Sequence, residues 1–94
     1  MSRGDGTVRR RVQVLNERGL HARVAARIAA TAERFDAEVR VRCKGHEVSA
    51  LSIMGLLMLA AQPGMRLDLI ATGADAAAAA DALVALFKSG FKDT

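Results

Sequence analysis

The chain has no Trp and no Tyr, and only 3 of its 94 residues are Phe. Its hydrophobic fraction of 51% therefore comes almost entirely from alanine and aliphatic side chains. A chain of this length buries roughly two-thirds of its unfolded surface, which is enough for one modest core. A small core of closely packed side chains argues against a large cofactor cavity, so we expect a single domain without a cofactor.

Cysteine is nearly absent too, because Cys43 is the only one and cannot form an internal disulfide. That usage is typical of a reducing compartment. The sequence also has no signal-peptide pattern and no apolar run long enough to cross a bilayer. We therefore expect a cytoplasmic protein with no membrane insertion.

The sequence has one short cluster of residue types that bind metals. Cys43, His46 and Glu47 lie close together in the sequence, but they lack the second pair of ligands that a zinc site requires. We expect no metal, and we interpret His46 as a surface residue at the end of a hairpin.

Positive charge is in excess, with 14 Lys and Arg against 10 Asp and Glu and a net charge of +4. Such a balance suits a nucleic-acid or acidic-protein partner. It is also typical of a solvated face, and the sequence favours that interpretation. The run Arg9-Arg10-Arg11 suggests nucleic-acid binding. However, the lack of Trp and Tyr removes most stacking platforms, and we expect no nucleic-acid partner.

Alternating apolar and polar residues predict four strands, and apolar residues at helical spacing predict three helices. In sequence order, the elements are a strand from Val8, a helix after His21, a hairpin over 37–50, a short helix over 53–59, a strand over 65–71 and a helix from Ala74 to about Lys88. The order is therefore β-α-β-β-α-β-α. Its simplest packing is an α+β fold, in which a four-stranded antiparallel sheet carries three helices on one face. Residues 1–7 are expected to form a flexible tail, which leaves 8–94 as the domain.

Local signals refine this outline. Arg10 interrupts the alternation of the first strand, which we attribute to a strand that has only just reached the core. The first helix is expected to bury Ala25, Ile28, Ala29, Ala32 and Phe35, opposite Arg23, Arg27 and Arg34. Gln62-Pro63-Gly64 predicts the end of the second helix, and Asp75 suits the positive start of the third.

His21 falls where a loop meets the first helix. The first backbone N–H groups of a helix have no internal partner, and the helix dipole favours an anion there by about 0.3–1 kcal/mol. Arg23 adds a planar donor fork suited to phosphate. An imidazole, exposed amides and a guanidinium within one turn would accept a phosphoryl group. The residues alone leave an alternative open, in which His21 only caps the helix and Arg23 faces solvent.

The second helix offers two further features. Ser52 precedes it and is either a second anion site or, as the physics favours, a plain N-cap. Ile53, Met54, Leu57 and Met58 would form a flexible apolar patch that suits several partners, or would be core side chains. We expect both interpretations of this apolar segment to hold in part.

Together these pieces resemble the HPr phosphocarrier family of the phosphoenolpyruvate-dependent phosphotransferase system. The resemblance extends from about Val8 to Asp93 and is most specific in Asn16-Glu17-Arg18-Gly19-Leu20-His21-Ala22-Arg23, which is similar to the family's active-site motif. Ser52-Ile53-Met54 resembles its regulatory-serine segment. The segments 35–39, 56–59 and 85–91 are more similar to the nitrogen-related branch, called NPr.

The resemblance implies an open-faced β-sandwich and a carrier protein rather than a stand-alone enzyme. It implies that His21 takes a phosphoryl group from enzyme I at Nδ1 and passes it to a IIA-type protein, while Arg23 neutralises the phosphoryl charge. It also implies a docking surface around the second helix. That surface comprises Ala22, Arg27, Ile53, Met54 and Leu57. We expect a monomer.

The family also suggests an alternative, a regulatory binding module in which an HPr-type serine kinase phosphorylates Ser52 and His21 transfers little. Two residues depart from the family pattern. Val24 stands where the family has proline, which would preset φ and remove a backbone donor. Arg18 stands where many relatives have a small polar residue, and the basic surface would favour an acidic docking face on partners.

Overall fold

The computed structural model describes residues 6–91, and within that range it contains the seven expected elements in the expected order. The strands are β1 (Val8–Gln13), β2 (Glu38–Cys43), β3 (His46–Ser49) and β4 (Arg66–Thr72). The helices are α1 (Ala22–Glu33), α2 (Ile53–Met58) and α3 (Ala76–Lys88). Residues 1–5, most of the expected flexible tail, lie outside the described residues.

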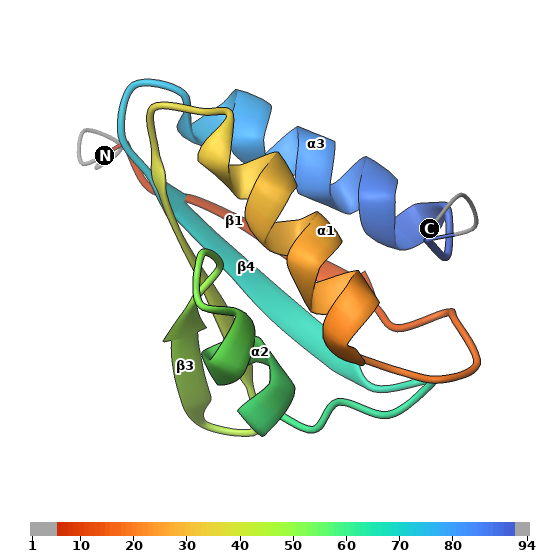
Figure 1. Ribbon diagram of the computed structural model, residues 1–94. Helices are drawn as coiled ribbons and strands as arrows, with labels where there is room; N and C mark the ends of the chain where they lie inside the picture. Colours follow the sequence, from red (N-terminus) through yellow and green to blue (C-terminus); the bar gives the residue numbers. More distant parts are fainter. Residues whose placement is uncertain (1–5, 92–94) are drawn as a thin grey trace.

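The four strands form one antiparallel sheet in the order β1-β4-β2-β3. The strand β4 therefore lies between β1 and β2, which run parallel to each other and are joined through α1, as in a split βαβ arrangement. Figure 1 shows α1 and α3 side by side across one face of the sheet, with α2 beside β3. The predicted α+β fold is confirmed. None of the helices in this range is long and apolar enough to span a membrane.

Strand alternation separates the two faces of the sheet. Val12, Leu67 and Val41 are buried on the helix-covered face, whereas the outward row pairs Arg11 with Asp68 and Asp68 with Arg42. Val12 is the first buried residue of β1, as expected of a strand that is only reaching the core, and Arg10 on the same face is exposed. Its guanidinium lies 3.5 Å from the Asp81 carboxylate of α3, so a long side chain on an edge strand reaches the rim of the helix layer.

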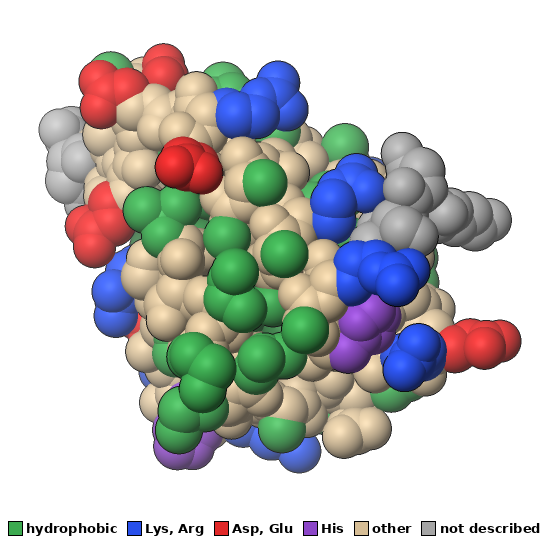
Figure 2. Space-filling model, in the orientation of Figure 1, with side chains coloured by type: hydrophobic (Ala, Val, Ile, Leu, Met, Phe, Trp, Pro, Cys, Tyr) green, Lys and Arg blue, Asp and Glu red, His purple; other side chains and the backbone are tan. Residues whose placement is uncertain are grey.

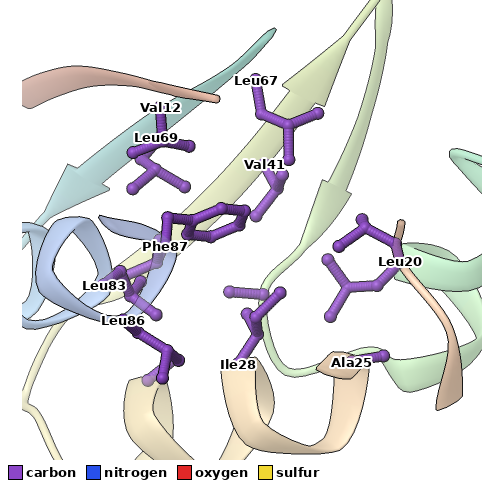
Figure 3. Close-up of a cluster of buried hydrophobic side chains, with 14 of the residues drawn as sticks. Val12, Leu20, Ala25, Ile28, Val41, Leu67, Leu69, Leu83, Leu86 and Phe87 are labelled. Atoms are coloured by element: carbon purple, nitrogen blue, oxygen red, sulfur yellow. The ribbon is translucent and has the colours of Figure 1, made fainter. Parts of the chain in front are cut away.

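The buried side chains form one cluster, part of which is shown in Figure 3. Phe87 of α3 packs edge-on against Phe91 with ring centroids 5.2 Å apart, a favourable aromatic geometry. The expected stripe of α1 is confirmed for Ala25, Ile28 and Ala32, while Ala29 and Phe35 are only half-buried. Val24, which the sequence pattern did not place in the core, is 1% exposed.

Different features mark the ends of two helices. The helix α2 ends at Met58, within one residue of the expected limit at 59, and Ala60 then adopts a left-handed φ of 53° that the helix cannot continue through. Asp75 is the N-cap of α3, but its side chain makes no capping bond. Its carboxylate instead accepts the Asp36 N–H at 2.7 Å, which joins the start of α3 to the loop after α1.

The loop before α1 is held against the segment after α2. The Leu20 N–H donates to the Ala61 carbonyl at 3.1 Å, and the Gly64 N–H donates to the Val14 carbonyl at 2.8 Å. Gly19 has a φ of +69°, and a Cβ at this position would overlap the Ala61 carbonyl oxygen. Only glycine therefore permits this approach without displacing one of the two segments.

We expect Gly19→Ala to lower the free energy of unfolding by at least about 1–3 kcal/mol, because it combines a positive φ with a backbone overlap. Gly64→Ala is the matched control, since its φ is +90° but a Cβ there would meet nothing within 4 Å. Urea unfolding of both variants makes the comparison. Equal losses of stability would show that the approach to Ala61 carries no specific cost.

Candidate functional site

His21 is the N-cap of α1, with extended backbone angles of φ −100° and ψ 178°. Its carbonyl accepts the first helical hydrogen bond, from the Ala25 N–H at 2.9 Å, but its imidazole makes no capping bond. The His21 side chain is therefore not the cap, although His21 is the N-cap residue and Arg23 is exposed, as the alternative interpretation expected. The N–H groups of Ala22, Arg23 and Val24 precede that first bond, at the positive end of the helix dipole.

The half-buried imidazole lies between two adjoining shallow hollows of about 550 and 160 Å³. Both are built from the loop before α1 and the end of α3, segments that are distant in sequence. The larger is lined by Leu15, Asn16, Glu17, Arg18, His21, Lys88, Ser89 and Gly90. The smaller is lined by Asn16, Arg18, His21, Arg23, Val24, Gly90 and Phe91.

Three cationic side chains thus surround the histidine. From the sequence, Arg23 was expected to help His21, Arg18 was only a departure from the family pattern, and Lys88 was only the approximate end of the third helix. The fold brings the end of α3 to His21, and Phe91 anchors that end in the core beside Phe87. No local pattern predicts such proximity, because it depends on how α1 and α3 pack.

Asn16 shapes the turn that leads to His21. Its side-chain amide donates to the Gly19 carbonyl at 2.7 Å, and its own carbonyl accepts the Gly19 N–H at 3.3 Å. The side-chain oxygen Oδ1 is buried and has no hydrogen-bond partner among residues 6–91. A buried acceptor without a donor costs about 1–3 kcal/mol. The turn therefore carries a buried, unsatisfied acceptor on a residue that lines the same hollows as His21.

Val24 occupies the position in the first turn of α1 where the family has proline. Its side chain packs into the core at 1% exposure, and α1 begins at Ala22 without help from a proline ring. The backbone N–H that proline would remove is retained in the first turn. The substitution therefore leaves the helix start intact and adds one donor to it.

Ser52 is the N-cap of α2, as the plainer interpretation expected. Its Oγ accepts the Gly55 N–H at 2.9 Å, and its side chain is half-buried. A Cβ on Gly55 would lie 2.9 Å from that Oγ, so glycine at this position avoids a close contact with the capping side chain.

The expected division of the α2 segment is confirmed. Leu56 is fully buried and Leu57 half-buried, whereas Ile53, Met54 and Met58 are 41%, 69% and 78% exposed. Leu51, which the sequence analysis missed, adds a further exposed side chain at 57%. Figure 2 shows hydrophobic side chains gathered over α2 and the start of α1, with Lys and Arg side chains next to them.

Since α2 packs against α1, the structure places the two groups of expected docking residues on neighbouring helices. Ala22 is exposed and Arg27 half-buried on α1, beside the patch on α2.

Cys43 is buried while His46 and Glu47 are exposed, and no three His, Cys, Asp or Glu side chains within 6–91 are grouped to hold a metal.

Comparison with known proteins agrees with this geometry. The family model of the HPr component of the phosphotransferase system, described as its phosphorylation site, matches residues 8–89. Phosphocarrier protein NPr of Shewanella violacea is 42% identical over 84 residues, which is 89% of this chain and 92% of that protein. Phosphocarrier protein HPr of Treponema pallidum is 42% identical over 82 residues, which is 87% of this chain and 93% of that protein.

Solved structures support the same assignment. The crystal structure of HPr from Thermoanaerobacter tengcongensis superposes with a TM-score of 0.87 at 36% sequence identity, and the match covers 90% of this chain and 96% of that one. Sequence and fold therefore agree over nearly the whole length, and the chain belongs to the HPr phosphocarrier family of the phosphotransferase system.

Proposed function

We propose that this protein accepts a phosphoryl group from enzyme I on Nδ1 of His21 and passes it to a IIA-type protein. The observation that carries the proposal is the place of His21. It caps α1 through its backbone alone, so its imidazole is not engaged as a cap, and it lies at the helix end whose first N–H groups have no partner within the helix. In the transfer, the N–P bond to His21 forms as the bond between phosphorus and its donor breaks.

The charges around His21 fit this step. Phosphoryl transfer passes through a loose transition state, so a site has to position the group and stabilise its oxygens more than it has to supply covalent chemistry. Arg18, Arg23 and Lys88 line the hollows at His21 and supply positive charge. The backbone donors of the first turn add oriented dipoles, which need no reorganisation when the group arrives.

The docking surface is the exposed part of α2 with the start of α1. Ile53, Met54 and Leu57 offer apolar area, and Ala22 and Arg27 lie on the neighbouring helix. Flexible methionine side chains suit a surface that must fit both a donor and an acceptor. We include Met58 and Leu51 in this surface because both are strongly exposed.

We further propose that the protein serves the nitrogen-related branch, as a monomer in the cytoplasm, with residues 8–94 as the carrier domain. Relatives of both branches are 42% identical to this chain. Overall identity therefore does not separate the two branches, and the proposal of the nitrogen-related branch depends on the segments 35–39, 56–59 and 85–91. A nitrogen-type IIA protein is the acceptor to test. Sedimentation velocity of the purified chain tests the monomer.

Incubation with phosphoenolpyruvate and the cognate enzyme I should give an acid-labile, base-stable phosphate that His21→Ala abolishes. Arg23→Ala should slow labelling about tenfold to a hundredfold, because a charge on the phosphoryl oxygens is lost. Arg34→Ala is the control, since Arg34 is exposed at the other end of the same helix. The proposal is wrong if His21→Ala labels as well as the parent chain.

Met54→Glu should raise the KM for transfer from enzyme I about tenfold, because a charge replaces an exposed apolar side chain at the centre of the docking surface. Ala78→Glu adds the same charge at an exposed position of α3. Steady-state transfer kinetics of the two variants make the comparison. Equal KM values would remove α2 from the docking surface.

The second candidate function is a binding module controlled by phosphorylation of Ser52. It is favoured by the position of Ser52 at the edge of the exposed α2 patch, where an added phosphate would alter the docking surface. A HPr-type serine kinase would then give an acid-stable phosphate on Ser52, with little label on His21. The reverse labelling pattern supports the carrier and counts against the module.

Ser52→Ala should lower the free energy of unfolding by about 1 kcal/mol, because the Gly55 N–H loses its acceptor. Ser52→Asp should restore most of that loss, since aspartate caps a helix well. Thermal unfolding of both variants measures the difference. If Ser52→Ala is as stable as the parent chain, the cap contributes nothing to folding.

A further inference from the structure

The face of the sheet away from the helices is strongly charged. Its outward positions carry five arginines, namely Arg9, Arg11, Arg40, Arg42 and Arg66, and three acids, namely Glu38, Glu47 and Asp68. Five positive against three negative charges leave a surplus of two on the strands, and Lys44 in the β2–β3 turn adds a third. The run Arg9-Arg10-Arg11 is divided between the faces, because Arg10 turns towards α3.

The acids on this face are largely occupied. Asp68 pairs with Arg11, with 2.9 Å between Nε and Oδ1, and Glu47 pairs with Arg40 at 3.1 Å. The hydrogen bond from Arg11 holds the pKa of the Asp68 carboxyl below its usual range, and the positive charges of Arg11, Arg42 and Arg9 act in the same direction. Arg9, Arg42, Arg66 and Lys44 form no ion pair with a carboxylate in the described part of the chain.

The surplus converges on one hollow. A shallow depression of about 660 Å³ at the start of β4 is lined by Arg11, Arg42, Lys44, Arg66 and a single acid, Asp68. Four cations around one carboxylate create a positive potential over the depression. Neither the sites of His21 and Ser52 nor the exposed α2 patch includes any of these residues.

We propose that this basic face of the sheet is a second docking surface, and that it binds an acidic, extended segment of a partner protein. Guanidinium groups accept carboxylates through paired hydrogen bonds. Neighbouring strands lie about 4.8 Å apart, so the cations of β1 and β2 that flank Asp68 are about 10 Å apart at their Cα atoms. Because Arg11 is already paired with Asp68, a chain with spaced carboxylates would pair chiefly with the other cations of the depression, Arg42, Lys44 and Arg66.

The same observations disfavour nucleic acid as the occupant. All three Phe residues lie elsewhere, with Phe87 and Phe91 buried and Phe35 packed against the core, so the face has no platform for base stacking. The row Arg11, Asp68, Arg42 and Glu47 alternates in sign across the sheet. A continuous polyanion would meet a carboxylate on every second strand, whereas a protein segment places its charges individually.

The test uses the full chain and a labelled peptide of about ten residues in which Glu and Ser alternate, an extended probe with spaced carboxylates. Binding is followed by fluorescence anisotropy, and amide proton–nitrogen spectra locate it. The proposal expects shifts on β1, β2 and β4 and binding that weakens as salt screens the charges. Shifts confined to α1 and α2, or no binding at low salt, would overturn it.

Arg66→Glu should weaken binding of this peptide about tenfold, because it places a like charge in the depression. Arg34→Glu makes the same charge change on an exposed residue of the helix side and should leave the affinity within about twofold of the parent value. Arg42→Gln provides a second, milder variant that should weaken binding without adding an acid opposite Asp68. Equal affinities of the three variants for the peptide would contradict the proposal.

Two further comparisons separate the surfaces and the partner classes. His21→Ala should bind the peptide as the parent chain does, and Arg66→Glu should accept phosphate from enzyme I at the parent rate, so this surface and the carrier function fail independently. Loss of peptide binding in His21→Ala would place the peptide at the carrier site. An oligothymidylate of equal charge that bound the depression more tightly than the peptide would identify nucleic acid as the occupant and refute an acidic protein segment.

Discussion

The functional end of this molecule depends on the contact between the loop before α1 and the segment after α2. The Leu20 N–H and the Ala61 carbonyl form a hydrogen bond there, and the missing Cβ of Gly19 makes the approach possible. Because His21 follows directly, this contact fixes where α1 begins and which way its first N–H groups point. It also positions the exposed face of α2 beside α1, so the proposed transfer site and the proposed docking surface depend on the same contact.

A second constraint is the difference between the two faces of the sheet, one covered by helices and one exposed. The helix-covered face carries a core of small side chains, and the packing of α3 within it brings the Phe91 region to His21. The outward face carries no helix and is free to hold charge. Residues one position apart along β1 and β4 therefore serve unrelated purposes, core packing on one side and a basic surface on the other.

Local periodicity predicted much of the fold. The strict alternation of β2 and β4 and the helical spacing in α3 identified these elements and their buried sides, because each pattern reports directly which face leaves water. The predictions failed where distant segments meet. Val24 is buried and Arg10 forms an ion pair with Asp81 of α3, and both facts follow from helix packing rather than from neighbouring residues. The left-handed φ of Ala60 after α2 is likewise not predicted by its side chain.

The sequence by itself determined that His21 opens a helix, that Arg23 lies in its first turn and that Ser52 caps the next helix, since caps and turns are set by residues a few positions apart. Only the tertiary structure decided that the His21 imidazole makes no capping bond, that Lys88 and Arg18 line the hollows at His21, and that Arg11, Arg42 and Arg66 line one depression. The physical reason is that these sites join segments far apart in the chain. The packing of α1 against α3 brings Lys88 to His21, and the position of β4 between β1 and β2 brings the three arginines together, and no local pattern of residues encodes either arrangement.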